Sequence, residues 1–429
     1  MSGLPEPVER LLRLYRAALG AADPAKVVPP YLPPPPTGCT VVVGMGKAAA
    51  AMAEAVEAHW LGPLGGVVVV PPGAGRTLRH VRVMEGSHPV PDERSVAAGN
   101  ALLAAVSNLQ PTDLVLALIS GGGSSLSALP AAGLELLDKQ RVTRHLFRAG
   151  ASIAEINIVR SHLSAINGGR LAARAYPARV VTLVISDVPG DDPASVASGP
   201  TLGDASTCVD ALVILNRYRL DDMPWLRKGL EKGAWESVFP NDPRLSGNTC
   251  HVIATGAHGL EAAAREAVAG GLPCPQLADA MEGEAREIAK AQAGIVLSVA
   301  ERSLPFAAPC VLISGGEATV TLRGQGRGGR NTEFALALAL ALEARPSASR
   351  VWGLSAGTDG LDGTSGAAGA WFGPETLSRA RSMGIDPRAH LDSNDSASLF
   401  DAIDGLIHTG PTFTNINDFR AILIEALPC

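Results

Sequence analysis

Short apolar runs alternate with longer mixed segments along most of the chain. The runs LVLALIS (Leu114–Ser120) and VVTLVIS (Val180–Ser186) are almost continuously apolar. Such runs are typical of parallel strands that are covered on both faces, whereas strict alternation would indicate a sheet with one face in water. Segments rich in Ala, Leu and Arg lie between them and have the length of helices. The pattern therefore predicts an α/β protein.

The same pattern places the individual elements. Nine strands are expected, at residues 40–43, 66–70, 81–84, 113–119, 180–185, 250–254, 310–313, 318–322 and 351–354. After a first helix at the N-terminus, eight helices are expected to begin near Lys47, Asp92, Leu134, Ile158, Ala257, Glu282, Asn331 and Pro374.

One segment interrupts this alternation. Residues 221–248 contain several prolines and charges and no expected strand. A chain of 429 residues also suits two domains better than one. We therefore predict an N-terminal Rossmann-like domain with a mostly parallel sheet at residues 1–240, and a C-terminal α/β domain at residues 241–429.

The amino-acid composition excludes several classes of protein. Hydrophobic residues make up 46% of the chain and charged residues 18%, which excludes a disordered protein. The net charge is −6, aromatic residues are 4%, and no basic block exists, so nucleic acid is not an expected partner. No apolar run reaches the length of a membrane span, and the N-terminus lacks a signal-peptide pattern, so we expect a cytoplasmic protein without a membrane partner. The six cysteines have no zinc-site spacing.

The first candidate loop joins the first strand to a helix. Read as a dinucleotide fingerprint, it is Gly44-x-Gly46-x-x-Ala49. That fingerprint also requires an acidic residue about 20 positions further on, to hold the ribose hydroxyls. Residues 61–75 contain no Asp or Glu, so the match is weak.

Lys47 follows this turn directly. A P-loop would continue with Ser or Thr, but Ala48 stands there. Only six of the 36 basic residues are lysines, and a lysine at a helix start is unfavourable unless an anion joins it. Lys47 is therefore predicted to direct its compact charge at a phosphate or carboxylate.

Two further loops follow buried strands. The loop Gly121-Gly122-Gly123-Ser124-Ser125 has the composition of a phosphate cradle; the alternative is a flexible strand–helix turn. Val188-Pro-Gly-Asp191 suits a type II turn, with Pro at its second and Gly at its third position. Asp187, Asp191 and Asp192 thereby lie at the carboxyl end of a strand, where they could hold Mg²⁺ or accept a proton; the alternative is that they only form the turn.

In the C-terminal half, Arg330 follows a Gly pair and precedes a helix, and Asp359 follows a buried strand. Arg330 could form a bidentate hydrogen-bonded contact with a phosphate or carboxylate. A small hydroxy acid needs a partner for its carboxylate, and Ser87, Arg160 and Arg330 are candidates between which the residues alone do not decide.

Taken in order, the motifs resemble a known family. They are VGMGKA (43–48), GSHPVP (86–91), SGGGSS (120–125), RSHLS (160–164), SDVPGD (186–191), GGRN (328–331), AGTDG (356–360), TGPT (409–412) and TNIN (414–417). This ordered set resembles the type 2 glycerate kinases, whose C-terminal half is called the MOFRL domain. The resemblance implies a C-terminal domain with a mixed sheet and an active site in the cleft between two domains.

The resemblance also implies an activity. It is the ATP-dependent phosphorylation of D-glycerate, with Mg²⁺, most often at the 2-hydroxyl. Phosphoryl transfer needs positioned phosphates, neutralised charge and an oriented hydroxyl, which these residue types can supply. The alternatives are an NAD(P)H-dependent hydroxypyruvate reductase and a non-catalytic nucleotide-binding regulator. Assembly as a homodimer is left open.

The site residues are assigned on the same basis. The expected catalytic residues are Lys47, Asp191, Arg330 and Asp359, with Asp191 and Asp359 also expected to bind the metal. The expected substrate ligands are Ser87, His88 and Arg160, and the expected ATP ligands are Gly44, Gly46, Gly121, Gly122, Gly123, Ser124 and Ser125.

Overall fold

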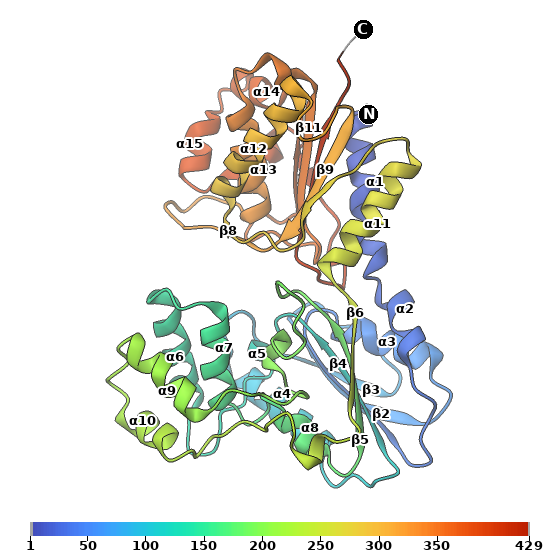
Figure 1. Ribbon diagram of the computed structural model, residues 1–429, viewed down its shortest axis with the longest axis vertical. Coiled ribbons are helices and arrows are strands. Elements are labelled where there is room, and N and C mark those ends of the chain that lie inside the picture. The colour runs from blue at the N-terminus through green and yellow to red at the C-terminus, as the bar shows by residue number, and fades with distance from the viewer. Residues whose placement is uncertain (1–2, 428–429) are drawn as a thin grey trace. The chain divides into compact units, whose positions relative to one another are not determined.

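The chain folds into two compact units, each of which is described by itself (Figure 1). The structure is a computed structural model that describes residues 3–427. Pro24–Ile253 form the N-terminal unit, and residues 254–427 form the C-terminal unit together with residues 3–23. No helix in the described part of the chain is both long enough and apolar enough to span a membrane.

A six-stranded sheet forms the centre of the N-terminal unit. Its strand order is β3-β2-β1-β4-β5-β6, and the neighbours from β3 to β5 all pair in parallel. The strands are β1 (Thr40–Met45), β2 (Leu64–Val70), β3 (Val81–Glu85), β4 (Leu114–Ser120), β5 (Arg179–Ile185) and β6 (Thr249–Ala254). This is the 3-2-1-4-5-6 order of Rossmann folds, and the order reverses between β1 and β4.

Helices cover both faces of this sheet because its strands are apolar on both sides. They are α2 (Pro24–Val27), α3 (Ala49–His59), α4 (Glu93–Ala105), α5 (Gly123–Leu126), α6 (Leu136–Arg148), α7 (Ile153–His162), α8 (Arg170–Ala175), α9 (Cys208–Arg217) and α10 (Pro224–Glu231). In Figure 1, α6, α7, α9 and α10 form a group beside the sheet. These four helices share a separate apolar core that includes Leu146, Val159, Leu215 and Leu226.

The C-terminal unit contains a mixed sheet in the order β13-β12-β11-β14-β9-β7. Its strands are β7 (Gln276–Ala278), β9 (Cys310–Gly316), β11 (Val351–Gly357), β12 (Gly369–Phe372), β13 (Leu406–Ile407) and β14 (Asp418–Ile424). β14 runs antiparallel to both β9 and β11, whereas β7 and β9 are parallel. A separate two-stranded pairing joins β8 (Gly283–Glu284) and β10 (Ala318–Thr319).

Two helical layers enclose the mixed sheet (Figure 1). α1 (Glu6–Ala21) and α11 (Gly256–Ala269) pack on one face, where Leu11, Tyr15 and Leu260 share a core with the sheet. α12 (Ala285–Arg302) and α13 (Arg330–Leu342) lie on the other face, and α13 is buried along almost its whole length. The remaining helices are α14 (Thr376–Ser382), α15 (Pro387–Asp392) and α16 (Ser396–Ala402).

These findings confirm the predicted α/β class, with a mostly parallel sheet followed by a mixed one. The composition of the units differs from the predicted division at residues 240 and 241. The first helix belongs to the C-terminal unit because its apolar stripe packs against α11 and the mixed sheet. The strand expected at 318–322 is shorter, Ala318–Thr319, and β14 was not expected at all.

Candidate functional site

The predicted residues of the N-terminal unit gather at one edge of its sheet. Met45 of β1 pairs with Ile119 of β4, and Ser120 pairs with Ile185 of β5, so these three strands end side by side. β2 and β3 end at the same edge, where Val70 pairs with Glu85. The loops that begin at residues 46, 86, 121 and 186 therefore share this edge. It includes the reversal of strand order between β1 and β4, where Rossmann folds bind ligands.

The Gly-x-Gly turn is shaped by the packing of the sheet. A Cβ on Gly44 would lie 2.9 Å from the Leu118 carbonyl oxygen and from a Val68 methyl group. The N–H of Lys47 donates to the Gly121 carbonyl at 3.0 Å, and the N–H of Ala48 donates to Ser120 Oγ at 3.0 Å. Two N–H groups of the turn that would face a pyrophosphate in a dinucleotide fold are thus engaged by β4 and the loop after it.

Asp187 lies directly against the three-glycine loop. A Cβ built on Gly121 would fall 1.5 Å from Asp187 Oδ2, so a side chain at this position would displace the Asp187 carboxylate. The sequence placed Asp187 at the carboxyl end of a strand and selected Asp191 as the catalytic carboxylate; the structure adds that Asp187 lies against the glycine loop. The signal for Asp187 was its position immediately after a buried strand whose neighbour ends in the glycine loop.

Asp191 closes the turn that the sequence predicted. Its N–H donates to the Val188 carbonyl at 3.0 Å, and Gly190 has φ +80°. These values fit a type II turn. Asp191 itself has φ +54°, a region that non-glycine residues rarely adopt. Its role as base or metal ligand stays a prediction.

The two serines after the glycines have different surroundings. Ser124 Oγ lies 2.7 Å from Ser198 Oγ. Ser125 is buried, and its hydroxyl donates to the Gly122 carbonyl at 3.0 Å. The hydroxyl of Ser125 therefore has a partner inside its own turn, whereas Ser124 lines a cavity.

The three predicted substrate ligands also lie in the N-terminal unit. Ser87 and His88 follow β3, and a Cβ on Gly122 would lie 3.0 Å from the His88 ring. Arg160 is on α7 and lines the same cavity as Ser124. Burial lowers the pKa of the Arg160 guanidinium. The structure thus brings His88 to the glycine loop and links Arg160 to that loop through the cavity.

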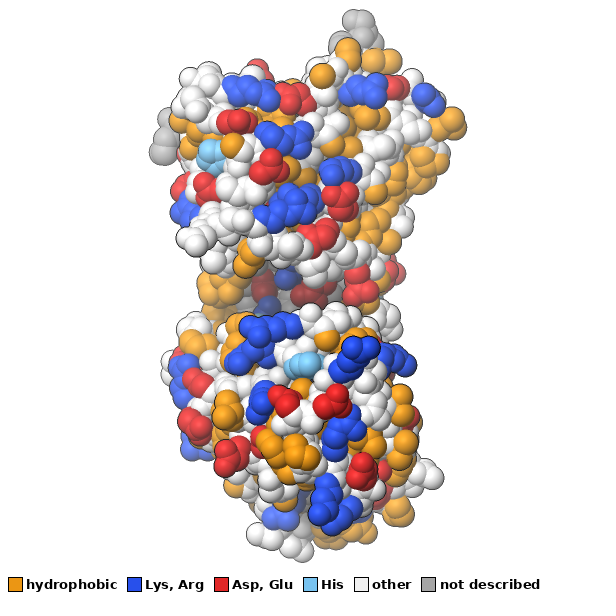
Figure 2. Space-filling view, turned by 90° about the vertical axis from the view of Figure 1, so that its left-hand side faces the viewer, with side chains coloured by type: hydrophobic (Ala, Val, Ile, Leu, Met, Phe, Trp, Pro, Cys, Tyr) orange, Lys and Arg blue, Asp and Glu red, His pale blue; other side chains and the backbone are white. Residues whose placement is uncertain are grey.

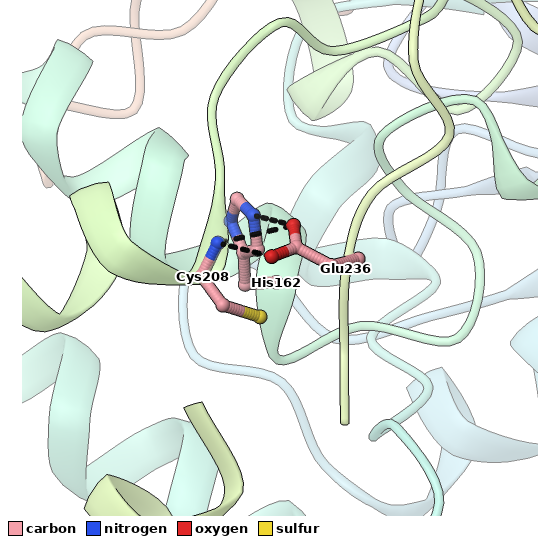
Figure 3. Close-up of side chains that lie close together, drawn as sticks. All are labelled: His162, Cys208 and Glu236. Atoms are coloured by element: carbon pink, nitrogen blue, oxygen red, sulfur yellow. Dashed lines mark hydrogen bonds and ion pairs between the residues drawn. The ribbon is translucent and has the colours of Figure 1, made fainter. Parts of the chain in front are cut away.

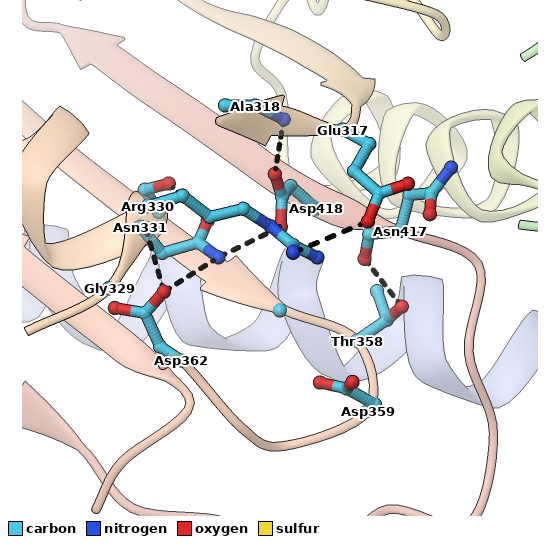
Figure 4. Close-up of polar contacts among 12 residues, drawn as sticks. Glu317, Ala318, Gly329, Arg330, Asn331, Thr358, Asp359, Asp362, Asn417 and Asp418 are labelled. Atoms are coloured by element: carbon cyan, nitrogen blue, oxygen red, sulfur yellow. Dashed lines mark hydrogen bonds and ion pairs between the residues drawn. The ribbon is translucent and has the colours of Figure 1, made fainter. Parts of the chain in front are cut away.

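A second polar cluster lies at one edge of the mixed sheet (Figure 4). Asp418 begins β14 and pairs with Gly357 at the end of β11 and with Gly316 at the end of β9. Arg330, the first residue of α13, donates from Nε to Asp418 Oδ1 at 2.7 Å. One of its terminal nitrogens lies 3.4 Å from Glu317 Oε1. Arg330 is therefore already engaged with carboxylates, where the sequence predicted a contact with a ligand.

Charge pairing dominates this second cluster. Burial disfavours ionisation of Asp418, but the guanidinium groups of Arg330 and Arg420 outweigh it and lower the pKa of that carboxyl. Burial likewise opposes the charge of Arg330, yet the carboxylates of Asp418 and Glu317 raise its pKa. Arg420 Nη2 donates to Asp418 Oδ2 at 2.8 Å, and both side chains are almost fully buried. Asp418 thus joins two cations.

Asp359 and Asp362 follow β11 but differ in role. Asp359 is 8% exposed and accepts the Leu361 N–H at 3.0 Å. It also lies close enough to Tyr15 that burial of the phenol and the Asp359 charge both raise the pKa of Tyr15. Asp362 accepts the N–H groups of Asn331 and Thr332 at 2.8 and 2.9 Å and so caps α13. Asp359 remains the candidate for chemistry.

A third group combines metal-ligating side chains in the N-terminal unit (Figure 3). Ligand atoms of His162, Cys208 and Glu236 lie within 4.8 Å of one another. The Glu236 carboxylate accepts the N–H of Cys208, the first residue of α9, at 3.1 Å and lies 3.7 Å from His162 Nε2. Burial raises the pKa of the Cys208 thiol to about 11, so it stays protonated at neutral pH. The spacing of the cysteines in the sequence did not indicate this group. In the structure, the Glu236 carboxylate holds the first N–H group of α9.

On the face drawn in Figure 2, basic and acidic side chains are interspersed on each unit.

Both units match family models. Residues 10–229 match DUF4147, a domain of unknown function, and residues 310–418 match the MOFRL family. The D-glycerate 2-kinase of Thermotoga maritima is 37% identical over 98% of this chain and 99% of its own. A protein of Agrobacterium vitis named "Putative hydroxypyruvate reductase" is 50% identical over 96% of this chain and 94% of its own.

A solved structure agrees with these sequence matches. The crystal structure of a glycerate kinase from Thermotoga maritima has a TM-score of 0.86 and 36% identity, and the match covers 98% of this chain and 100% of that one. The two matched domains and the full-length similarity to glycerate kinases place the chain in a class of α/β kinases. The chain belongs to the glycerate kinase family that is built from these two domains. The resemblance stated from its motifs is thereby confirmed.

Proposed function

We propose that this kinase transfers the γ-phosphoryl group of ATP to the 2-hydroxyl of D-glycerate, with Mg²⁺, to give 2-phosphoglycerate. The observation that carries the proposal is the convergence of Lys47, the Gly121–Ser125 loop and Asp187 at the sheet edge of the Rossmann-like unit. A cation, a close-approaching backbone and a carboxylate are the parts that phosphoryl transfer needs.

The same edge argues against hydride transfer from a nicotinamide cofactor. The N–H groups of Lys47 and Ala48, in the turn before α3, are hydrogen-bonded to Gly121 and Ser120, so these two groups are not available to a pyrophosphate. The acidic residue that would hold the ribose is also absent from residues 61–75. Two relatives carry the name "Putative hydroxypyruvate reductase", so the kinase and reductase activities should be compared by experiment.

In this mechanism Lys47 neutralises charge that spreads over the transferred phosphoryl group. A carboxylate accepts the proton of the attacking hydroxyl; Asp191 and Asp359 were predicted for this role, and Asp187 joins them because it contacts the glycine loop. The carboxylate oxygens of Asp187 and Asp191 suit Mg²⁺, which would neutralise the phosphates of ATP when bound. The proposal also keeps two predictions for the C-terminal unit: Arg330 contacts a phosphate or carboxylate of a substrate, and Asp359 acts as the base or as a metal ligand.

Two assays separate the activities. ADP release is measured with D-glycerate, ATP and Mg²⁺, and NAD(P)H oxidation is measured with hydroxypyruvate. We expect ADP release alone, and phosphorus NMR of the product should show the phosphate on the 2-hydroxyl. NAD(P)H oxidation without ADP release would refute the kinase proposal, and a 3-phosphorylated product would refute only the position.

Removing a metal ligand should change the Mg²⁺ requirement. We expect Asp187→Asn or Asp191→Asn to raise the Mg²⁺ concentration at half-maximal rate by about 10-fold or more, because an amide oxygen carries no charge. Asp192→Asn is the matched control, since Asp192 is exposed and its carboxylate accepts from Ser195 and Ala194 of its own loop. Titration of the rate with Mg²⁺ measures the effect. If all three variants behave alike, the loop is only a turn.

A further inference from the structure

A cavity of about 320 Å³ opens beside the glycine loop of the N-terminal unit. One wall is formed by α6 and α7, and the cavity reaches Ser124 at the glycine loop. Its walls combine apolar side chains with basic ones, including Val90, Pro91, Phe147, Lys139 and Arg160. The volume suits a small organic molecule rather than a single ion.

The basic side chains of this cavity lack counter-charges. Lys139 is only 7% exposed, yet no carboxylate within residues 3–427 forms an ion pair with Lys139 or Arg160. Burial lowers the pKa of the Lys139 ammonium to about 7, and repulsion from Arg160 and Arg170 adds to this. Charged groups are almost never buried without a partner, because the loss of hydration is not repaid. The fold therefore carries a cost that an anionic ligand would remove.

We propose that this cavity binds the oxyanion group of a small organic ligand, with Lys139 and Arg160 as its paired cations. The identity of the ligand rests on the proposed function. The two substrates of that function both carry oxyanions: D-glycerate has a carboxylate, and ATP has phosphates. Ser124 links the cavity to the loop at which the reaction is proposed to occur. Lys139 thus becomes a ligand-binding residue that the motifs did not indicate.

Binding without turnover tests the site. Calorimetry measures D-glycerate, ATP and inorganic phosphate on the wild-type enzyme, Lys139→Met, Arg160→Met and Lys228→Met. We expect the Lys139 and Arg160 variants to bind one of the two substrates on the order of 10-fold to 100-fold more weakly. The substrate affected identifies the source of the oxyanion. Lys228, an exposed lysine of α10, provides the matched control.

The outcomes separate this site from the proposed function. Unchanged affinity of both variants for all three ligands would overturn the site. Loss of affinity in an enzyme that shows no ADP release would support the site and refute only the kinase proposal. Weaker binding of phosphate alone would show an adventitious anion site and would overturn the assignment to a substrate.

Stability distinguishes a binding charge from a structural one. The pKa of Lys139 lies below its ordinary value, so its charge destabilises the fold below about pH 7, and this cost fades as the pH rises toward 10. We expect unliganded Lys139→Met to be at least as stable as wild type at pH 6, with the difference shrinking at higher pH. The other charged groups that face this region are the guanidinium groups of Arg144 and Arg148 of α6, Arg160 of α7 and Arg170 of α8. A lower melting temperature for the variant at pH 6 would show a structural role and contradict the proposal.

Discussion

Lys47→Ala is expected to lower kcat on the order of 10²-fold to 10³-fold, while the enzyme remains folded. The reason is that Lys47 is positioned by the hydrogen bond of its N–H to Gly121, beside the loop that is proposed to hold phosphates. A preorganised charge of this kind acts mainly on the transition state, so kcat should fall more than KM rises. Initial rates of ADP release measure the effect, and the unfolding midpoint checks the fold.

Two further variants sharpen this test. Lys47→Arg should also be impaired, because a planar guanidinium replaces a compact ammonium. Lys232→Ala removes an exposed lysine of the same unit and should keep the wild-type rate. Near-normal turnover in Lys47→Ala would remove Lys47 from the catalytic machinery.

Asp418→Ala is expected to lower the free energy of unfolding by about 3–5 kcal/mol, because it leaves buried cations without their partner. Asp418 is 2% exposed and Arg420 is 1% exposed, so water cannot replace the lost carboxylate. Arg330 would lose its 2.7 Å contact at the same time. Denaturant unfolding measures the loss.

Asp401→Ala is the matched control for this change. Asp401 forms an ion pair with Arg327, but both side chains are substantially exposed. Exposed ion pairs contribute about 0–1 kcal/mol, so the control should unfold close to wild type. If Asp418→Ala unfolds like Asp401→Ala, the buried network does not hold the edge of the mixed sheet together.

The fold could be predicted where strands are apolar throughout. The runs at 114–120 and 180–186 became β4 and β5, and helices began within a few residues of most expected positions. β14 was not expected, and its first three residues include the charged Asp418 and Arg420. Their burial depends on pairing with each other and with Arg330, which lies far away in the sequence.

Some residues of the candidate site could likewise be proposed from the sequence, and others could not. Lys47 and the three-glycine loop could be proposed from the sequence because each lies in a turn that follows a buried strand. Adding Asp187 to Asp191 as a candidate required the register in which Ser120 pairs with Ile185. Lys139 could not be recognised, since a lysine in an amphipathic helix usually faces water, and its burial results from tertiary packing around α6.

The membership of α1 in the C-terminal unit has a consequence for protein synthesis. This helix is translated before Pro24–Ile253, and its partners α11, β11 and β14 are translated only after all of that segment. At 5–20 residues per second the interval is on the order of tens of seconds. During that time the apolar stripe that includes Leu11, Leu14 and Tyr15 has no native surface to cover it, and a nascent chain at this stage offers chaperones a binding site that the finished enzyme lacks.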